Sequence, residues 1–528
     1  MNDLLLDGLL ALPAGFAVLT AVLAGRERRD PVAVRVAALG GLLTLAWSVW
    51  LVLAAPGLRA VDHPWLAALD VHWRLGLDGI SAPLVLLTTL ITAGCLVSLL
   101  RAPASTTPGR GALAALLLLV ETGVLGSFVA LDMVLFFVFF EVALIPLWFV
   151  IDRWGDRHDP RGRRRAATRF LVFTVLGSAL MLVGFMLVRE VAGTFDIVTV
   201  AARGVTGQAG SSQSGLLAAA AVLVALGLAV KTPLWPLHIW LPDAHAKAPT
   251  VGSVLLAAVL LKLGSYGLIR FWMPLVDPGW QLLAPCLAAL GVVGIVYAAL
   301  ACLVQDDLKR LIAYSSVGHM GFVALGVATF TVGGVQAAVF VSVAHGLITG
   351  LLFFLAGGIK DRYDTTLLDR LQVLYGRLPR LAGLFAFAAM ASLGLPGLAG
   401  FWGEMLAIRA AVFPDGALPR GTYLVLAVIA ALGVVLTAAY FLALMRRILQ
   451  GAPPAVQPVN PDTDSVELVS EEVEPGTATV EPRPLPDVRR SEWLVWTPLA
   501  ALTVLLGVMP GLLLTPVAEA ARAYFGGL

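Results

Sequence analysis

The sequence contains little charge for its length. Only 13% of its 528 residues are charged, 59% are hydrophobic, and the mean hydropathy is +0.89. Soluble globular domains carry about 25% charged residues. Because charge is this scarce and apolar residues are this common, we expect a protein that crosses a lipid bilayer many times rather than a soluble domain.

Cysteine is scarce as well, and this excludes several kinds of site. The three cysteines, Cys95, Cys286 and Cys302, lie in separate apolar runs and form no Cys-x-x-Cys pair, whereas an iron–sulfur cluster needs about four thiolates. The chain also has no Gly-x-Gly-x-x-Gly or Walker-type loop. We therefore expect no cofactor, disulfide framework or metal site on this chain, and no nucleic-acid partner.

Long apolar runs make up most of the sequence. A helix that crosses the ~30 Å hydrocarbon core of a bilayer needs about 20 residues. This length predicts fourteen transmembrane helices, at 4–24, 34–54, 79–100, 111–131, 133–151, 168–189, 215–239, 250–273, 281–303, 311–332, 336–359, 381–411, 422–445 and 493–515. Most Lys and Arg residues then fall in every second loop, which indicates that these loops are cytoplasmic and that both termini lie outside.

Two of the predicted helices are interrupted, the seventh at Lys231–Pro236 and the twelfth at Gly394–Gly397. Proline removes a backbone donor and breaks a helix, and broken helices in corresponding halves of a chain are typical of a transport site. The offset of five helices predicts two inverted five-helix repeats, 111–273 and 281–447, within an all-α fold. Two unrelated proline kinks are the alternative.

The remaining segments complete the predicted domain organisation. Residues 1–110 form three N-terminal helices, and residues 493–528 form the C-terminal helix. The linker 448–492 lies between the second repeat and the C-terminal helix. It is rich in proline and acidic residues from residue 451 onward. This composition is typical of disorder, and the charge pattern predicts that the linker is cytoplasmic.

Ionisable residues lie deep within several predicted helices. A charge at the bilayer centre costs from about 2.5 to more than 10 kcal/mol, so Glu141, Lys231, Lys262 and Glu404 are candidates for a proton or cation path. Lys231 could instead extend its long side chain to the membrane surface. Lys262 is too deep for this, and we expect a switchable proton site there, with Glu141 as the partner of Lys231.

Six further residues are weaker candidates. His319 and His345 lie near the middles of the tenth and eleventh helices and could relay protons, because imidazole titrates near neutrality, or could simply pack there. Glu121 could be a relay member or a structural hydrogen-bonding residue. A cluster at the inner end of the seventh helix consists of His238, Asp243 and His245. These residues could form an entry funnel for protons or ordinary helix caps.

Four motifs resemble those of the antiporter-like membrane subunits of respiratory complex I, the NADH:quinone oxidoreductase. They are Phe136–Gly155, Pro236–Thr250, Leu260–Gly267 and Gln305–Gly321, and together they cover most of 130–405. The acid in the first motif and the glutamate at position 404, where some sister subunits carry lysine, are most similar to the M-type subunits of the bacterial enzyme.

The resemblance implies a fold, a function and a set of partners. It implies fourteen helices with two inverted units in a bacterial inner membrane, and proton translocation coupled to electron transfer from NADH to quinone. It places FMN, the iron–sulfur clusters and the quinone on partner subunits, and it implies contacts with other membrane subunits, including sister antiporter-like chains, and with the lipid bilayer.

The resemblance also implies roles for individual residues. Glu141 and Lys231 would form the input-side pair, Lys262 the central relay, and Glu404 the output residue, while His319 and His345 would connect the two halves. Three other functions stay open on the sequence alone. They are a subunit of an Mrp-type cation/proton antiporter, a membrane subunit of a hydrogenase, and a structural spacer that conducts nothing.

Overall fold

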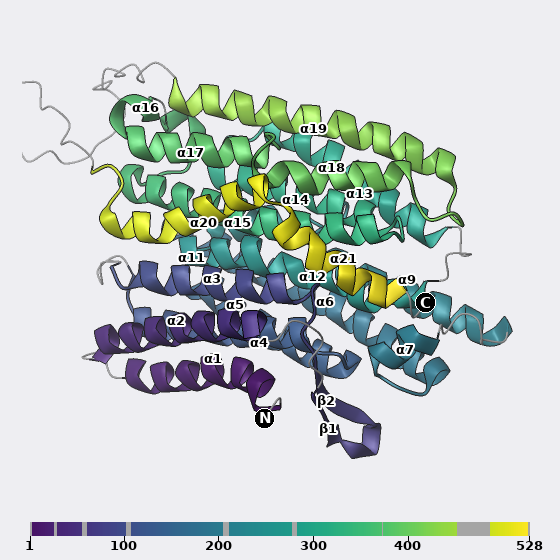
Figure 1. The fold of residues 1–528 in the computed structure, drawn as a ribbon. Coiled ribbons are helices and arrows are strands. Elements are labelled where there is room, and N and C mark those ends of the chain that lie inside the picture. The colour runs from purple at the N-terminus through teal and green to yellow at the C-terminus, as the bar shows by residue number, and fades with distance from the viewer. Residues whose placement is uncertain are drawn as a thin grey trace, which may run out of the picture.

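The computed structural model of the chain describes residues 3–25, 29–54, 61–101, 107–203, 211–276, 282–371, 373–450 and 486–525. Within these residues, twelve helices are long and apolar enough to cross a membrane. They run side by side in a single bundle (Figure 1). The prediction of a helical fold with many membrane-spanning segments is therefore confirmed. The linker predicted at 448–492 falls largely outside the described residues.

The first half of the chain supplies seven of these long helices. They are α1 (Asp3–Ala24), α2 (Asp30–Ala54), α3 (Ala82–Leu99), α4 (Arg110–Val129), α5 (Met133–Trp154), α6 (Pro160–Ala192) and α9 (Ser211–Lys231), and a short α7 (Ile197–Arg203) precedes α9. Side chains fix several starts: Asp132 accepts hydrogen bonds from the first free amides of α5, and Asp159 accepts one at α6, where Pro160 follows. Such caps satisfy amides that have no partner inside the helix.

A β-hairpin that the sequence did not predict lies between α2 and α3. Strands β1 (Val61–Leu66) and β2 (Val71–Leu75) pair antiparallel. The indole of Trp73 donates to Asp7 at 2.9 Å, so the hairpin lies against the start of α1 (Figure 1). A window of about 20 apolar residues cannot detect strands of this length.

The second half contains both long and divided helices. They are α13 (Leu283–Leu303), α14 (Leu308–Val327), α15 (Val332–Tyr363), α16 (Leu374–Arg377), α17 (Pro379–Ser392), α18 (Ala399–Val412), α19 (Arg420–Leu449), α20 (Arg490–Val508) and α21 (Gly511–Phe525). The predicted helices 311–332 and 381–411 correspond to α14 and to the pair α17–α18, which are not among the twelve long apolar helices. The count of fourteen and the inverted repeat stay predictions.

Two membrane-spanning stretches lie entirely inside the bundle. Every residue in the apolar windows of α15 and of Thr250–Leu275 is buried. The second stretch is irregular: α11 (Thr250–Leu255) and α12 (Leu261–Gly267) alternate with π-helical turns at Leu256–Leu260 and Leu268–Trp272, and a short 3₁₀ turn ends it. π-Helical turns are frequent at functional sites. These two stretches carry Lys262 and His345, so both side chains are attached to backbone inside the bundle.

The seventh predicted helix is interrupted where its prolines lie. Helix α9 ends at Lys231, and α10 (Leu241–Lys247) begins only after Pro233 and Pro236. Carbonyls that lose their helical partner at membrane depth need another donor. The indole of Trp240 supplies one, because it donates to the Val230 carbonyl at 3.0 Å.

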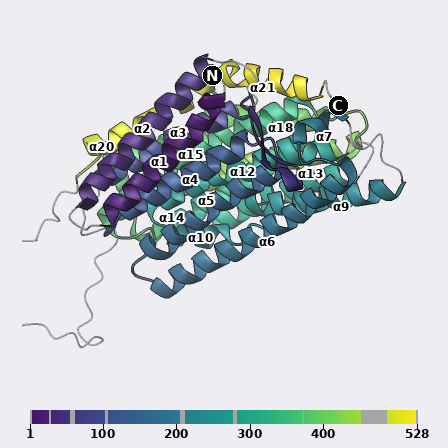
Figure 2. The ribbon, with the colours of Figure 1, turned by 90° about the horizontal axis from the view of Figure 1, so that it is seen from below.

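The twelfth predicted helix is interrupted between α17 and α18. Gly394 and Gly397 have φ angles of +85° and +91°, a region that glycine adopts without steric cost. Helix α20 covers this break: a Cβ on Gly507 would lie 2.2 Å from the Gly397 carbonyl oxygen, and the Trp402 indole donates to the Gly507 carbonyl at 2.7 Å. Figure 2 shows α20 and α21 along one edge of the bundle and α6 along the opposite edge.

Close contact between α9 and α12 gives a test of the packing. A Cβ on Gly264 would lie 2.2 Å from the Thr232 hydroxyl and 2.6 Å from its backbone nitrogen. We expect Gly264→Ala to destabilise the protein by about 1–3 kcal/mol, because the two helices must separate. The measurement is thermal unfolding of the purified protein, with Gly333→Ala in α15 as the control, since no atom lies within 4 Å of that Cβ position. Equal midpoints for both variants would contradict the expectation.

Candidate functional site

Four of the predicted residues form a buried row across the centre of the bundle. The Nζ atom of Lys262 on α12 lies 2.6 Å from Nδ1 of His345 on α15. The rings of His345 and His319, the latter on α14, have centroids 5.4 Å apart. Nδ1 of His319 then lies 2.8 Å from the carboxylate of Glu404 on α18. All four side chains are buried, so we name this set the central row.

The hydrogen bonds of the central row fix where protons sit. Lys262 also donates to the carbonyl of Ala257, in the first π-helical turn, at 2.7 Å. An ammonium group only donates, so a charged Lys262 requires that Nδ1 of His345 accept and that its Nε2 carry the hydrogen. On His319, Nδ1 faces Glu404 and Nε2 lies 3.1 Å from the hydroxyl of Ser392. Nδ1 of His345 therefore faces Lys262, and Nδ1 of His319 faces Glu404. In each imidazole the other nitrogen, Nε2, points away from that partner.

A small cavity lies where the two histidines meet. It offers about 10 Å³ to the centre of a water molecule, which is room for one water. Three atoms of the residues that line it have no hydrogen-bond partner among the described residues, namely Nε2 of His345, Oε2 of Glu404 and the hydroxyl of Thr349. Buried polar groups are rarely left unpaired. A single water in this cavity would bridge His345 to the Glu404 side of the row.

Lys231 lies at the break of the seventh helix, but it does not contact its predicted partner directly. Its side chain is 1% exposed, and its Nζ atom lies 4.6 Å from the ring centroid of Phe140 and 5.9 Å from that of Phe170. Nζ has no hydrogen-bond partner among the described residues, and no ion pair joins it to Glu141 within 4.0 Å. The charge of Glu141 still acts on Lys231. The ammonium group instead makes cation–π contacts with the rings of Phe140 and Phe170.

Glu121 is buried in α4 and is not part of the central row. Its side chain is fully buried, and neither carboxylate oxygen has a hydrogen-bond partner among the described residues. The choice between a relay and a structural role therefore stays open for this residue.

The cluster at the inner end of the seventh helix divides into three environments. Asp243 is held by Arg169 of α6 and by Arg310 of α14, the latter at 3.0 Å, which fits a clamp between helices. His238 packs beside the ring of Tyr297, with centroids 5.1 Å apart. His245 is fully buried and stacks on Phe353 with centroids 4.5 Å apart, and neither of its ring nitrogens has a partner among the described residues.

Lys309 is a buried charge that the sequence did not single out. Lys309, near the start of α14, is 2% exposed and donates to the Ala248 carbonyl at 2.9 Å. The predicted helices 281–303 and 311–332 leave it in the cytoplasmic loop between them, beside Asp306, Asp307 and Arg310. The rarity of lysine was the available signal, since the chain has only five, at positions 231, 247, 262, 309 and 360. Among the described residues, no group of three or more His, Cys, Asp or Glu side chains could hold a metal ion.

The sequence matches a known family over more than half of its length. Residues 130–441 match the family model described as "NADH:quinone oxidoreductase/Mrp antiporter, TM". The chain belongs to this family. The matched region contains the whole central row, both interrupted helices and Lys309.

Individual relatives agree with this assignment. The chain is 39% identical over 470 residues to NADH-quinone oxidoreductase subunit M of Rhodobacter capsulatus, covering 87% of this chain and 83% of that protein. It is 40% identical over 395 residues to NAD(P)H-quinone oxidoreductase chain 4 1 of Synechococcus sp. (strain JA-2-3B'a(2-13)), covering 74% and 72% of the two chains. The resemblance to the M-type subunits is therefore confirmed.

Solved structures share the fold of the whole chain. A chain of respiratory complex I from Thermus thermophilus with bound NADH matches with a TM-score of 0.81, 30% identity and complete coverage of both chains. A chain of the Mrp complex from Dietzia sp. DQ12-45-1b matches with a TM-score of 0.80 and 26% identity, over 98% of this chain and 52% of that one. The chain is thus an antiporter-like membrane subunit of this family.

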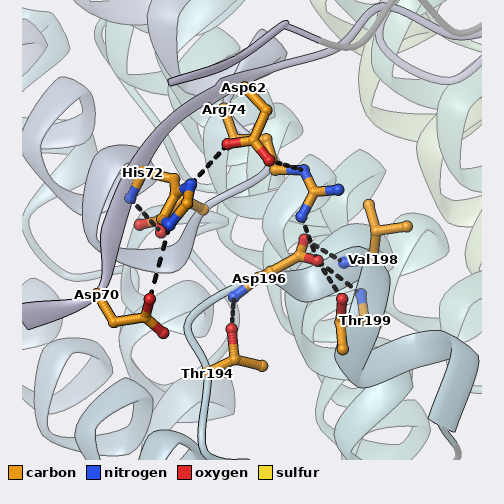
Figure 3. Close-up of polar contacts among 9 residues, drawn as sticks. Asp62, Asp70, His72, Arg74, Thr194, Asp196, Val198 and Thr199 are labelled. Atoms are coloured by element: carbon orange, nitrogen blue, oxygen red, sulfur yellow. Dashed lines mark hydrogen bonds and ion pairs between the residues drawn. The ribbon is translucent and has the colours of Figure 1, made fainter. Parts of the chain in front are cut away.

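A second polar cluster joins the hairpin to α7, next to the start of α5 and separate from the central row. Figure 3 shows the guanidinium of Arg74 between Asp62 of β1 and Asp196, which accepts the amides of Val198 and Thr199 at the start of α7. The His72 ring lies 2.7 Å from Asp62 and 3.6 Å from Asp70. The hydrogen bond that the His72 ring donates to Asp62 raises the pKa of His72, and the negative charges around it act in the same direction.

The raised pKa of His72 predicts how the stability of the hairpin depends on pH. Because the folded state binds this proton more tightly than the unfolded state, the stabilisation is complete at low pH and disappears as pH rises through the folded-state pKa. We expect His72→Gln to lower the free energy of unfolding in acid by about 0.2–1 kcal/mol, as for exposed ion pairs. In alkali we expect the substitution to leave the free energy of unfolding unchanged. Unfolding curves across this pH range test it, with exposed His63→Gln as the control. A deficit independent of pH would contradict it.

Proposed function

We propose that this chain is a proton-translocating membrane subunit of an NADH:quinone oxidoreductase. The observation that carries the proposal is the central row, in which Lys262, His345, His319 and Glu404 form a line of acids and bases buried inside the bundle. Ionisable groups at this depth are costly and are usually retained for transport. The sequence relationship to subunit M supplies the class of enzyme.

The geometry supports a direction for proton transfer along the row. A proton that leaves Lys262 would be taken by Nδ1 of His345, which would release its other proton from Nε2 into the small cavity. His319 would take a proton at Nε2, on the side of Ser392, and give one to Glu404 from Nδ1. Each imidazole passes a proton by accepting at one nitrogen and releasing at the other. Glu404 would then act as the output residue.

The first half of the chain would control this transfer through charge. Glu141 and Lys231 act on each other electrostatically without a direct ion pair, so a small movement of α5 or of the broken helix would change the attraction strongly in a low-dielectric interior. We assign them the role of an input-side pair that sets whether Lys262 holds its proton. Glu121 is buried in α4, which packs against the α5 helix that carries Glu141, and it is a further candidate for this control.

The redox chemistry would take place on other subunits. The family relationship supports FMN, iron–sulfur clusters and quinone on partner chains, with this chain in contact with sister antiporter-like subunits in a bacterial plasma membrane. The distribution of Lys and Arg supports both termini outside and the linker 448–492 in the cytoplasm. The hairpin and α7 would then face the outer side.

A role in an Mrp-type antiporter is the second candidate, because one family model describes both groups and the Dietzia chain shares the fold. The curated relatives at 39% and 40% identity are quinone oxidoreductase subunits, which favours the first candidate. Purification of the native assembly decides between them. NADH-oxidising partners support the first candidate, and a set of antiporter subunits without redox partners supports the second.

Replacement of the central lysine tests the proposal directly. We expect Lys262→Ala to lower the number of protons pumped per electron, because His345 loses the group that supplies its proton, while the complex still assembles. The measurement is the pH change in proteoliposomes that contain the purified complex and oxidise NADH with a quinone. Lys247→Ala removes a lysine that is ion-paired with Asp156 and Asp159 on the inner side, and it serves as the control. Undiminished pumping in Lys262→Ala would falsify the central role.

The input-side pair has its own test. We expect Glu141→Gln to slow NADH:quinone turnover, because Lys231 loses the negative charge that acts on it while the size of the side chain is kept. The loss is expected to be partial, since aromatic rings still surround the ammonium group. Turnover is measured in membranes, and equal amounts of assembled complex are verified first. Wild-type turnover would remove Glu141 from the mechanism.

A further inference from the structure

A cluster of aromatic rings fills the part of the first half that lies toward the predicted outer side of the membrane. At its centre is Phe136, whose ring centroid lies 4.3 Å from that of Phe271 and 6.4 Å from those of Phe185 and Tyr266. Every ring of the cluster is at most 1% exposed. We name this cluster the aromatic plug, and it consists of Phe128 of α4, Phe136 and Phe140 of α5, Phe185 of α6, and Tyr266 and Phe271 of the stretch Thr250–Leu275.

The aromatic plug lies between the buried lysines and the outer side. Its inner end is Phe140, whose ring centroid lies 4.6 Å from the Nζ atom of Lys231. Tyr266 follows Lys262 by one helical turn on α12, and the same stretch ends at the turn Met273–Leu275, which contacts α7. Because α7 lies on the predicted outer side, the plug separates both lysines from that side.

A buried ion pair lies at the outer end of the plug. Arg270 donates to Asp78, which lies between β2 and α3, and the Arg270 guanidinium is 5.6 Å from the ring centroid of Tyr266. The two charged side chains are only 8% and 14% exposed. Helix α21 covers the adjoining backbone, since a Cβ on Gly79 would lie 2.0 Å from the carbonyl oxygen of Pro516. We name Arg270 and Asp78 the outer ion pair.

The outer ion pair is unsuited to relaying protons. Arginine does not release its proton near neutral pH. Burial opposes the charge of Asp78, but the Arg270 guanidinium and the amides of Ser81 and Ile80 hold the pKa of Asp78 below its ordinary value. Asp78 therefore stays ionised at neutral pH, and neither member of the pair exchanges a proton.

We propose that the aromatic plug and the outer ion pair form a seal that closes the first half of the chain toward the outer side of the membrane. The proposal rests on the proton-translocating function above. Channels exclude protons by the same two means, since a hydrophobic constriction expels water and a fixed arginine opposes the passage of a positive charge. The seal prevents protons on Lys231 and Lys262 from escaping directly to the outer side, so these protons have to move along the central row.

The ordinary explanation of the plug is core packing, because buried aromatic rings stabilise a bundle. Two substitutions of the central ring separate packing from sealing. Phe136→Leu removes the ring but keeps the position apolar, and small apolar cavities stay dry. Phe136→Ser leaves space together with a hydroxyl group that binds water. A seal that works by excluding water fails with serine and holds with leucine, whereas a loss of packing affects both variants.

The experiment measures the passive leak of protons through the whole complex in proteoliposomes without NADH. A pH gradient is imposed, and a pH-sensitive dye follows its decay while valinomycin and potassium remove the membrane potential. We expect Phe136→Ser to accelerate the decay several-fold and Phe136→Leu to keep the wild-type rate. The matched control is Phe195→Ser, which we expect to keep the wild-type rate as well. The Phe195 ring is 2% exposed but lies outside the plug, 5.0 Å from the Arg189 guanidinium.

The outer ion pair is tested in the opened plug. We expect the double variant Phe136→Ser/Arg270→Gln to leak faster than Phe136→Ser, because Asp78 loses the cation that keeps it ionised and becomes able to bind a proton. Equal rates would remove the outer ion pair from the seal. If the complex with Phe136→Ser does not assemble, Phe185→Ser at the α6 side of the plug replaces it, with the same expected leak.

The outcomes separate the seal from the proposed function itself. A wild-type decay rate in assembled Phe136→Ser overturns the seal. Equal acceleration in Phe195→Ser or in Phe136→Leu also overturns it, because the leak would then come from general loss of packing. These results leave the central row in place, since the decay is measured without NADH. Normal pumping in Lys262→Ala would overturn the proposed function, and with it the purpose of the seal, without affecting the leak measurement.

Discussion

The contact between Lys262 and His345 is the constraint on which the rest of the bundle depends. A lysine in a low-dielectric interior must have acceptors for its donors or give up its charge. Lys262 has two acceptors, the imidazole of His345 and the carbonyl of Ala257. Both belong to stretches with no lipid-facing surface, α15 and Thr250–Leu275. The other helices therefore have to enclose these two on all sides, and their apolar outer faces meet the bilayer.

Irregular backbone makes this enclosure possible. The π-helical turn Leu256–Leu260 leaves the Ala257 carbonyl within reach of the Lys262 ammonium. Glycine lets the elements around it approach closely, as at Gly264 beside Thr232 and at Gly507 beside Gly397. At the break in the seventh helix the Trp240 indole donates to the Val230 carbonyl, and beside the break in the twelfth helix the Trp402 indole of α18 donates to the Gly507 carbonyl of α20. Irregular backbone at membrane depth is tolerated where protein surrounds it, and here it lies beside the charged residues.

The sequence predicted the apolar helices, the two breaks and the residues of the central row, because each leaves a local signal. A charge inside an apolar run, as at Lys262 and Glu404, is visible without a structure. Distances between helices leave no such signal, so the stacking of Lys231 on Phe140 in place of a direct pair with Glu141 could not be predicted. The hairpin was too short for the hydropathy window. Lys309 was hidden by the charged residues beside it, since burial there depends on how α10 and α11 fold over it.

The proposed proton path differs on the two sides of Lys262, toward Glu404 and toward Lys231. From Lys262 to Glu404, the groups are hydrogen-bonded or separated by a cavity with room for one water. From Lys262 to Lys231, no hydrogen bond connects the two lysines among the described residues, and the Lys231 ammonium has no polar partner. A path that was continuous from one side of the membrane to the other would let protons flow back and dissipate the gradient. Transporters avoid this by opening one side at a time. The conformation described here joins Lys262 to the Glu404 side, so a productive cycle requires a second conformation in which that connection is broken while Lys262 takes up its proton.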